Sequence, residues 1–151
     1  MIRPTDTGGE RWITVYANLI DDKALLEKRS DSDVRIVIQG LHAGLPVESI
    51  HRLGALMGKS QRVIAEAVQI PTRTLSRRKR FKPTESDRIF RLSHLFHRAA
   101  EVLGDLTETR RWFSSPRKAL GGKTPMELSD TDIGAREVED LLGRIEHGVF
   151  S

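Results

Sequence analysis

The sequence predicts an all-α protein. In several stretches apolar residues recur at the spacing of an amphipathic helix, as Val34, Val37, Ile38 and Leu41 do. Residues that cap or stop helices flank these stretches, and every element that the pattern defines clearly is helical. None of these helices is long enough to be stable alone, so their apolar faces must pack on one another. We expect roughly seven to nine helices.

The composition is that of an ordinary soluble protein and excludes thiol chemistry. The 151 residues suffice for one domain or two small ones, and 38% hydrophobic residues can form a modest core. The chain has no cysteine, which excludes disulfides, thiolate zinc sites and thiol catalysis. It has no apolar run of about 18 residues and no apolar signal-peptide core, so we expect a cytoplasmic protein without a membrane span.

The first half of the chain is expected to be helical from Ser32 onward. Residues 1–31 are interpreted as an N-terminal extension of undefined order, and an arm, a short strand and a helix all remain open for residues 11–16. Helices are predicted over 32–43 and 46–57, and Gly44 and Gly58 are placed to end them. Residues 60–68 form the next predicted helix, and a short one begins near Thr72.

The stretch from Ser60 to Lys82 has the layout of a helix-turn-helix, two short helices joined by a tight turn. Ala65 falls where the two helices cross and only a small side chain fits, and Ile70 and Leu75 can lock the second helix onto the first. Gln69 departs from the pattern, because this position usually holds Gly to allow a positive φ. The second helix carries six cations, and no acid lies between Glu66 and Glu85.

A basic second helix of this kind predicts contact with DNA. Hydroxyl and guanidinium groups suit phosphates, arginine can bind a guanine edge, and Gln61 at the start of the first helix can reach the backbone. The alternative is a solvated charged face on an ordinary helix, and the apolar locking pattern favours DNA. We expect residues 72–74 and 76–78 to face outward. The predicted contacts are Gln61, Thr72, Arg73, Thr74, Ser76, Arg77, Arg78, Lys79 and Arg80.

The second half is also predicted to be helical. Residues 84–87 resemble a capping box with Thr84 as the N-cap of a long helix that Gly104 ends. Asp105 and Thr124 are placed to cap two further helices, and a final helix is predicted over 135–147. A boundary near Pro83 divides the chain into a DNA-binding half, residues 32–83, and a second half, residues 84–151.

The chemistry of the second half differs from that of the first. From Thr124 onward seven acids stand against two arginines, which suggests a surface for a partner other than nucleic acid. Trp112 at the end of a short helix is typical of a core residue, and Gly121-Gly122 of a helix stop followed by a turn. The five histidines form no metal-ligand pattern and no catalytic constellation can be identified, so neither an enzyme nor a bound metal or cofactor is expected.

Two groups of motifs carry a family resemblance. The segment A-L-G-G-K-T-P-M-E-L at 119–128, followed by Asp130-Thr131, Gly134 and the helix over 138–148, resembles the toxin-binding domain of the Xre/MbcA/ParS antitoxins. T-L-S-R-R at 74–78 and E-S-D-R at 85–88 resemble the Xre-like half of the same proteins. The resemblance covers about residues 33–151 in the right order. It implies an Xre-like helix-turn-helix domain followed by a helical toxin-binding domain.

The resemblance implies a function and two partners. Such antitoxins bind and neutralise a RES-domain toxin that depletes NAD, cover its active-site entrance, and repress their own operon as dimers on operator DNA. A stand-alone helix-turn-helix regulator with a C-terminal dimerisation or ligand domain is the alternative. An acidic chain end with an apolar anchor could plug a basic NAD pocket. We therefore expect toxin contacts at Trp112, Glu146, His147, Gly148, Val149, Phe150 and Ser151.

Overall fold

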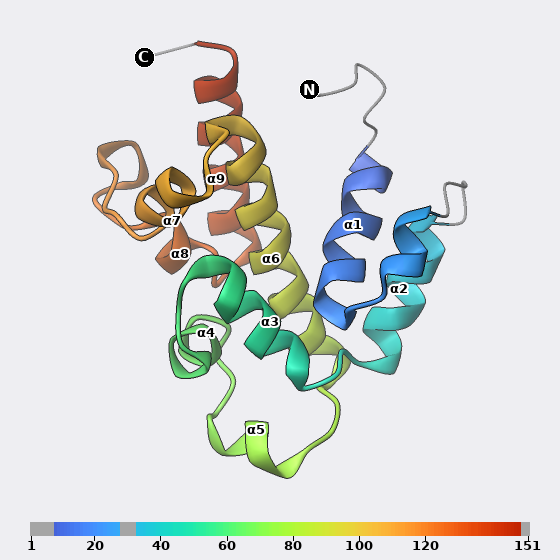
Figure 1. Ribbon diagram of the computed structural model, residues 1–151. Coiled ribbons are helices and arrows are strands. Elements are labelled where there is room, and N and C mark those ends of the chain that lie inside the picture. Colours follow the sequence, from blue (N-terminus) through green and yellow to red (C-terminus); the bar gives the residue numbers. More distant parts are fainter. Residues whose placement is uncertain (1–7, 28–32, 149–151) are drawn as a thin grey trace.

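Helices make up most of the computed structural model, which describes residues 8–27 and 33–148 (Figure 1). The predicted all-α class is confirmed, because the described ranges contain no strand beyond an isolated antiparallel bridge between Pro46 and Arg80. Two 3-10 turns, η1 (Lys23–Glu27) and η2 (Lys118–Leu120), complete the fold. The helices are α1 (Gly8–Ile20), α2 (Asp33–Ala43), α3 (Glu48–Met57), α4 (Gln61–Ala67), α5 (Arg73–Arg77), α6 (Pro83–Leu103), α7 (Leu106–Phe113), α8 (Pro125–Leu128) and α9 (Asp132–Glu146).

Helix α6 is the element on which the others pack. Figure 1 shows it running between α1 and α2 on one side and α7 and α9 on the other. Its buried apolar face includes Ile89, Leu92, Phe96 and Ala99. These side chains belong to one continuous cluster that draws members from α1 through α9. The helix-turn-helix half and the second half therefore share a core among the described residues.

Residues 11–16, for which the sequence left three conformations open, belong to helix α1, which contributes to that core. Val15, Ala17 and Leu19 are buried, and the helix packs against α2, α3 and α6. Tyr16 lies directly on Gly40 of α2, where an added Cβ would be 1.9 Å from the tyrosine hydroxyl oxygen. The close crossing of α1 and α2 therefore depends on a residue without a side chain at position 40.

Side-chain caps start several helices where the sequence predicted them. The hydroxyl of Ser60 accepts from the Val63 amide at 3.2 Å, the Asp105 carboxylate from the Thr107 amide at 2.8 Å, and the Thr124 hydroxyl from the Glu127 amide at 3.0 Å. The caps at Asp105 and Thr124 were predicted and are confirmed, and the cap at Ser60 is an addition that the structure shows.

Three predicted helix starts were wrong. Helix α3 begins at Glu48 rather than at Pro46, which instead forms the antiparallel bridge with Arg80. Helix α6 begins at Pro83 rather than after Thr84, because proline suits the first helical position. The carboxylate of Glu85 then accepts from the Lys82 amide at 2.7 Å. Helix α9 begins at Asp132, earlier than the predicted residue 135, because Thr131 caps it by accepting from the Gly134 amide at 3.0 Å.

Five arginines donate hydrogen bonds to carbonyl groups at the C-terminal ends of helices to which they do not belong. The last carbonyls of a helix lack partners within it, and they lie at the negative end of the helix dipole. Each of these contacts therefore satisfies a helix end, and most of them connect separate elements. With N···O distances from 2.7 to 3.4 Å, the pairs are Arg52 to Leu19, Arg80 to Gly44, Arg88 to Val68, Arg110 to Leu56 and Arg117 to Trp112.

The turn between α4 and α5 keeps the left-handed geometry of the motif without glycine. Gln69 has a φ of 58°, a conformation that costs a residue with a Cβ about 1–2 kcal/mol. The carbonyl groups of Val68 and Gln69 both accept from the Arg88 guanidinium, at 2.7 and 3.4 Å. Arg88 of α6 thus holds the turn in the conformation that the helix-turn-helix requires.

Helices α8 and α9 meet at Gly134, where the backbones approach too closely for any side chain. A Cβ on Gly134 would lie 1.9 Å from the Leu128 carbonyl oxygen. Gly143 lies later in the same helix, and a Cβ there would meet nothing within 4 Å. The structure therefore excludes a side chain at Gly134 but not at Gly143.

We predict opposite effects of alanine at these two glycines. Gly134→Ala should lower the free energy of unfolding by roughly 1–3 kcal/mol, because a backbone carbonyl must move. Gly143→Ala should raise it by up to about 1 kcal/mol, because alanine favours the helix and has room. Urea unfolding followed by circular dichroism measures both. Equal effects at the two sites would contradict the close approach of α8 and α9.

We predict that Gln69→Gly stabilises the protein by up to about 1 kcal/mol, since relief of the left-handed strain outweighs the added freedom of the unfolded chain. This corresponds to a rise of about 2–4 °C in Tm. Gln39→Gly is the matched control on the exposed side of α2, and there the same change should cost about 0.5–1 kcal/mol. A loss of stability at both positions would show that Gln69 is not strained.

Candidate functional site

The predicted helix-turn-helix is present as α4, the Gln69 turn and α5. Ala65 and Ile70 are buried where the two helices pack, as the motif requires. Helix α5 stands at the end of the molecule drawn lowest in Figure 1. The chain that leaves it is fixed, because the Val47 amide donates to the Lys79 carbonyl at 3.0 Å and the Phe81 amide to the Leu45 carbonyl at 2.9 Å. This arrangement presents α5 at the tip of a braced loop.

The exposed part of α5 carries cationic and hydroxyl groups. Arg73 and Arg77 are four residues apart and lie on one face of the helix. Their side chains and that of Lys79 have no hydrogen-bond or ion-pair partner in the part of the chain that the structure describes. Gln61 is also exposed, and its amide nitrogen lies 2.9 Å from Nδ1 of His51 in α3. The predicted contacts that remain exposed are Gln61, Thr72, Arg73, Ser76, Arg77, Lys79 and Arg80.

Two residues that were expected to face outward do not do so freely. Thr74 is only 7% exposed, because its position on α5 turns it toward the interior, so the prediction that it faces outward was wrong. Arg78 is partly buried and forms a fork with Glu85, with nitrogen-to-oxygen distances of 2.9 and 2.8 Å. Arg80 remains exposed, but its guanidinium donates to the Gly44 carbonyl at 2.8 Å. Some cations of the basic stretch are therefore engaged in hydrogen bonds within the protein.

Glu85 is the residue at this site that the DNA-contact prediction missed. The hydrogen bonds from Arg78 lower the pKa of the Glu85 carboxyl below its ordinary value, and the Lys82 amide adds to this effect. The pair stabilises the folded state at neutral pH, and this contribution is lost as the pH falls through the lowered pKa. Its position three residues after Lys82, just past Pro83, is the sequence signal that could have shown its capping role.

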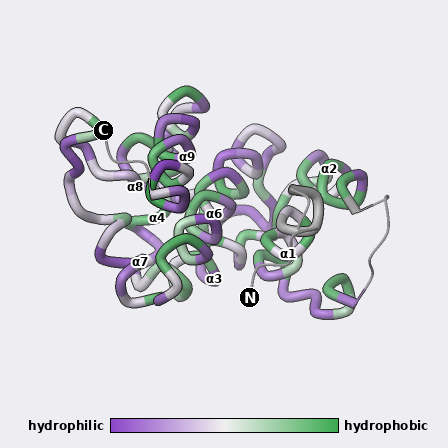
Figure 2. Tube along the Cα trace, turned by 90° about the horizontal axis from the view of Figure 1, so that it is seen from above, coloured by the Kyte–Doolittle hydropathy of each residue, from purple (hydrophilic) through white to green (hydrophobic). Residues whose placement is uncertain are grey.

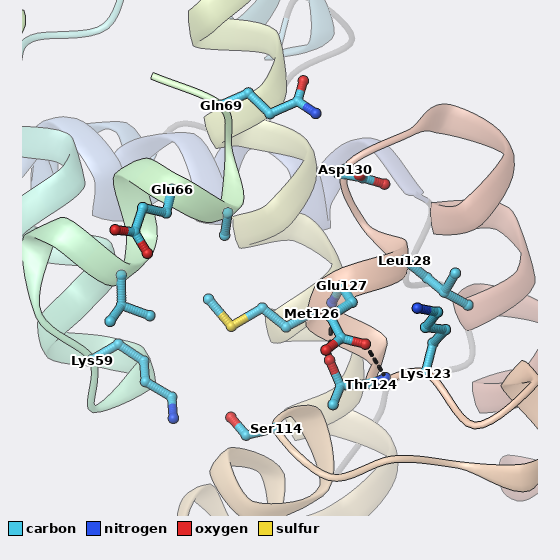
Figure 3. Close-up of a pocket in the computed structure, with 12 residues that line it drawn as sticks. Lys59, Glu66, Gln69, Ser114, Lys123, Thr124, Met126, Glu127, Leu128 and Asp130 are labelled. Atoms are coloured by element: carbon cyan, nitrogen blue, oxygen red, sulfur yellow. Dashed lines mark hydrogen bonds between the residues drawn. The ribbon is translucent and has the colours of Figure 1, made fainter. Parts of the chain in front are cut away.

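A cleft of about 740 Å³ lies between α4 and the α8 region, which Figure 3 shows in close-up. The motif residues Lys123, Thr124 and Met126 line one side, and the Met126 side chain extends across toward Glu66 of α4 in Figure 3. Lys59 is the cation on the α4 side. Charges of both signs line the cleft, so it shows no preference for an anionic or a cationic ligand.

The predicted toxin contacts at Trp112 and Glu146 are engaged within the chain. Trp112 is 7% exposed, and the Arg117 guanidinium lies 5.3 Å from the centre of its ring. Trp112 is thus a core residue, which leaves its ring little surface for a partner. Glu146 forms an ion pair with Arg98 of α6. His147 and Gly148 are exposed at the end of α9, and Val149, Phe150 and Ser151 lie outside the described residues.

The outward face of α9 is acidic and carries one prominent apolar side chain. Ile133 is 75% exposed, the highest value for a large hydrophobic residue in the described ranges. Glu137 and Asp140 follow it at helical spacing, are exposed, and have no ion-pair partner among residues 8–27 and 33–148. The sequence predicted the acidic character of this region but not which face of the helix is uncovered.

Within the described ranges no three histidine, aspartate or glutamate side chains are grouped so that they could hold a metal ion. None of the helices described has the combination of length and apolar character needed to cross a bilayer.

Comparisons with known proteins match both halves of the chain. Residues 37–94 match the antitoxin Xre-like helix-turn-helix domain, and residues 98–148 match the antitoxin Xre/MbcA/ParS C-terminal toxin-binding domain. The Antitoxin Xre of Yersinia enterocolitica is 44% identical over 110 residues, which span 70% of this chain and 72% of the relative. The Antitoxin Xre of Photorhabdus laumondii is 34% identical, with 74% of this chain and 78% of the relative covered.

A more distant relative is the Prs ADP-ribosylating antitoxin of a Sphingobium species, 25% identical over 72% of this chain and 76% of its own length. The two family domains occur in the order in which the structure places the basic α5 and the acidic α9. The chain therefore belongs to the Xre antitoxin family, with an Xre-like helix-turn-helix domain followed by a C-terminal toxin-binding domain.

Proposed function

We propose that this chain is the antitoxin of a type II toxin-antitoxin system and acts as a homodimer in the cytoplasm. It binds a RES-domain toxin that depletes NAD, covers the entrance to the toxin's active site and so neutralises it. It also represses its own operon through the helix-turn-helix. The observation that carries the proposal is the placement of two oppositely charged surfaces, α5 and α9, in the two family domains of one chain.

The DNA-binding part of the proposal is supported by the free cations of α5 and of the segment that directly follows it. Arg73, Arg77 and Lys79 have no partner in the described part of the chain, so their charges are available to phosphates and base edges. Arg78 is paired with Glu85, and we assign it the role of bracing α5 against α6. The proposed DNA face is therefore narrower than the basic stretch of the sequence.

The toxin-binding part of the proposal is supported by the acidic character of α9 and its surroundings. NAD is anionic, so a pocket that binds it is expected to be basic, and an acidic partner would complement the entrance. The name of the Sphingobium relative refers to ADP-ribosylation, a reaction that consumes NAD, which supports an NAD-consuming toxin as the partner. We further propose that the residues after α9, from Gly148 onward, enter that pocket.

We predict that the double substitution Arg73→Ala and Arg77→Ala weakens binding to DNA from upstream of the gene by at least about a hundredfold. The slope of log affinity against log salt should also fall by about one for each phosphate contact that is lost. Fluorescence anisotropy over a range of salt concentrations measures both quantities.

The matched control for this prediction is Arg111→Ala, because Arg111 is an exposed arginine of α7 whose partner is Glu108. That variant should bind DNA as the wild type does. Unchanged affinity in the double variant, with Tm maintained, would show that α5 is not the recognition helix. Arg78→Ala is a poorer test because it also leaves Glu85 without its partner.

We predict that deletion of residues 148–151 abolishes protection against the toxin while operator affinity and Tm stay at wild-type values. Gly148 is exposed and follows the last turn of α9, so its removal leaves the described core intact. Cellular NAD during co-expression with the toxin provides the readout. Full protection by the truncated chain would reject the plug and leave toxin binding to other parts of the domain.

A further inference from the structure

An apolar groove of about 420 Å³ runs along the first half of α6. It is lined neither by α5 nor by the outward face of α9 that carries Ile133, Glu137 and Asp140. Helices α1 and α2 form one bank and α9 forms the other, an arrangement that Figure 2 shows on the two sides of α6. We propose that a second copy of this chain docks in this groove, which would make it the dimer interface. The proposal deepens the proposed function, because it names the surface through which the homodimer forms.

Folding leaves apolar surface uncovered in the groove, which supports its role as an interface. Trp12 is 38% exposed and Ile38 is 45% exposed, and they reach the groove from two different helices. The Trp12 ring meets His94 edge-on with ring centres 6.1 Å apart, and His94 stacks on Phe90 at 6.2 Å. The groove is therefore preformed and lined by packed rings. Contiguous apolar surface with a polar rim is typical of a protein interface.

The charges around the rim of the groove indicate that a second copy of the chain can dock there. Arg91 lies 3.7 Å from Asp87 on α6, and Arg136 lies 3.2 Å from Asp132 on α9. Positive and negative side chains are thus both present on α6 and on α9 around the groove. A copy related by a two-fold axis can place its acids against these arginines and its arginines against these acids. Anionic DNA or a partner of a single charge sign would meet repulsion on part of the rim.

The position of the groove relative to α5 also suits a dimer that binds the operator as proposed above. The groove follows residues 87–95 of α6, and α5 lies beyond the N-terminal end of that helix (Figure 1). A two-fold axis roughly parallel to α6 would therefore place both copies of α5 at the same end of the dimer. One α5 of five residues can contact few bases, whereas two can read two half-sites.

Ile38→Asp tests the interface, because it places a charge in the groove at a position that is half exposed in the single chain. We expect the dissociation constant of the dimer to rise at least about a hundredfold. Sedimentation velocity without DNA or toxin measures it. The Tm of the diluted, monomeric protein should remain near that of the wild type. Ile133→Asp is the matched control, since Ile133 is more exposed but does not line the groove, and this variant should dimerise normally.

Trp12→Ala provides an independent second variant if Ile38→Asp fails to fold. It should also raise the dissociation constant of the dimer. A wild-type chain that stays monomeric well above micromolar concentration overturns the proposal. Normal dimerisation of folded Ile38→Asp also overturns it, and loss of toxin binding in that variant would then assign the groove to the toxin. Since dimerisation is measured on the chain alone, a dimer that binds no operator would reject the proposed repression and leave the groove assignment standing.

Discussion

Arginine side chains that reach the C-terminal ends of neighbouring helices are the interaction on which the rest of this structure depends. Short helices such as α3 and α4 leave a large share of their carbonyl groups without partners, at the negative end of the helix dipole. Arg110 of α7 supplies donors to the end of α3, and Arg88 of α6 to the end of α4. Each contact caps a helix of the DNA-binding domain and fixes it to the following part of the chain.

The same chemistry divides the arginines of the chain into two sets. Arg78 and Arg80 belong to the basic stretch, yet their guanidinium groups are committed to Glu85 and to the Gly44 carbonyl. Arg73 and Arg77 have no such partner among the described residues. The paired set holds α5 in position, and the free set leaves it a narrow, oriented cationic face. Under the proposed function, positioning and DNA recognition are thus carried by different residues of one short segment.

Local signals were sufficient to predict most of the fold. Caps such as Asp105 and Thr124 act within a few residues of their own position, so their roles can be predicted from spacing. Helix α1 could not be predicted, because its strand-forming residues become helical only through tertiary packing, including Tyr16 on Gly40. The burial of Thr74 and the exposure of Ile133 also depend on which helix face a distant element covers. The predicted outward orientation of Thr74 was wrong for this reason, whereas Trp112 is a core residue, as its place at the end of a short helix indicated.

The proposed function requires that operator DNA and toxin contact different parts of one packed helical body. Hydrogen–deuterium exchange of backbone amides tests it most directly, with each ligand added separately at saturation. Operator DNA should slow exchange in residues 61–79 and leave the exchange of residues 132–148 unchanged. The toxin should slow exchange within residues 98–148 and leave the exchange of α5 unchanged. Protection of α9 by DNA, or of α5 by the toxin, would contradict it.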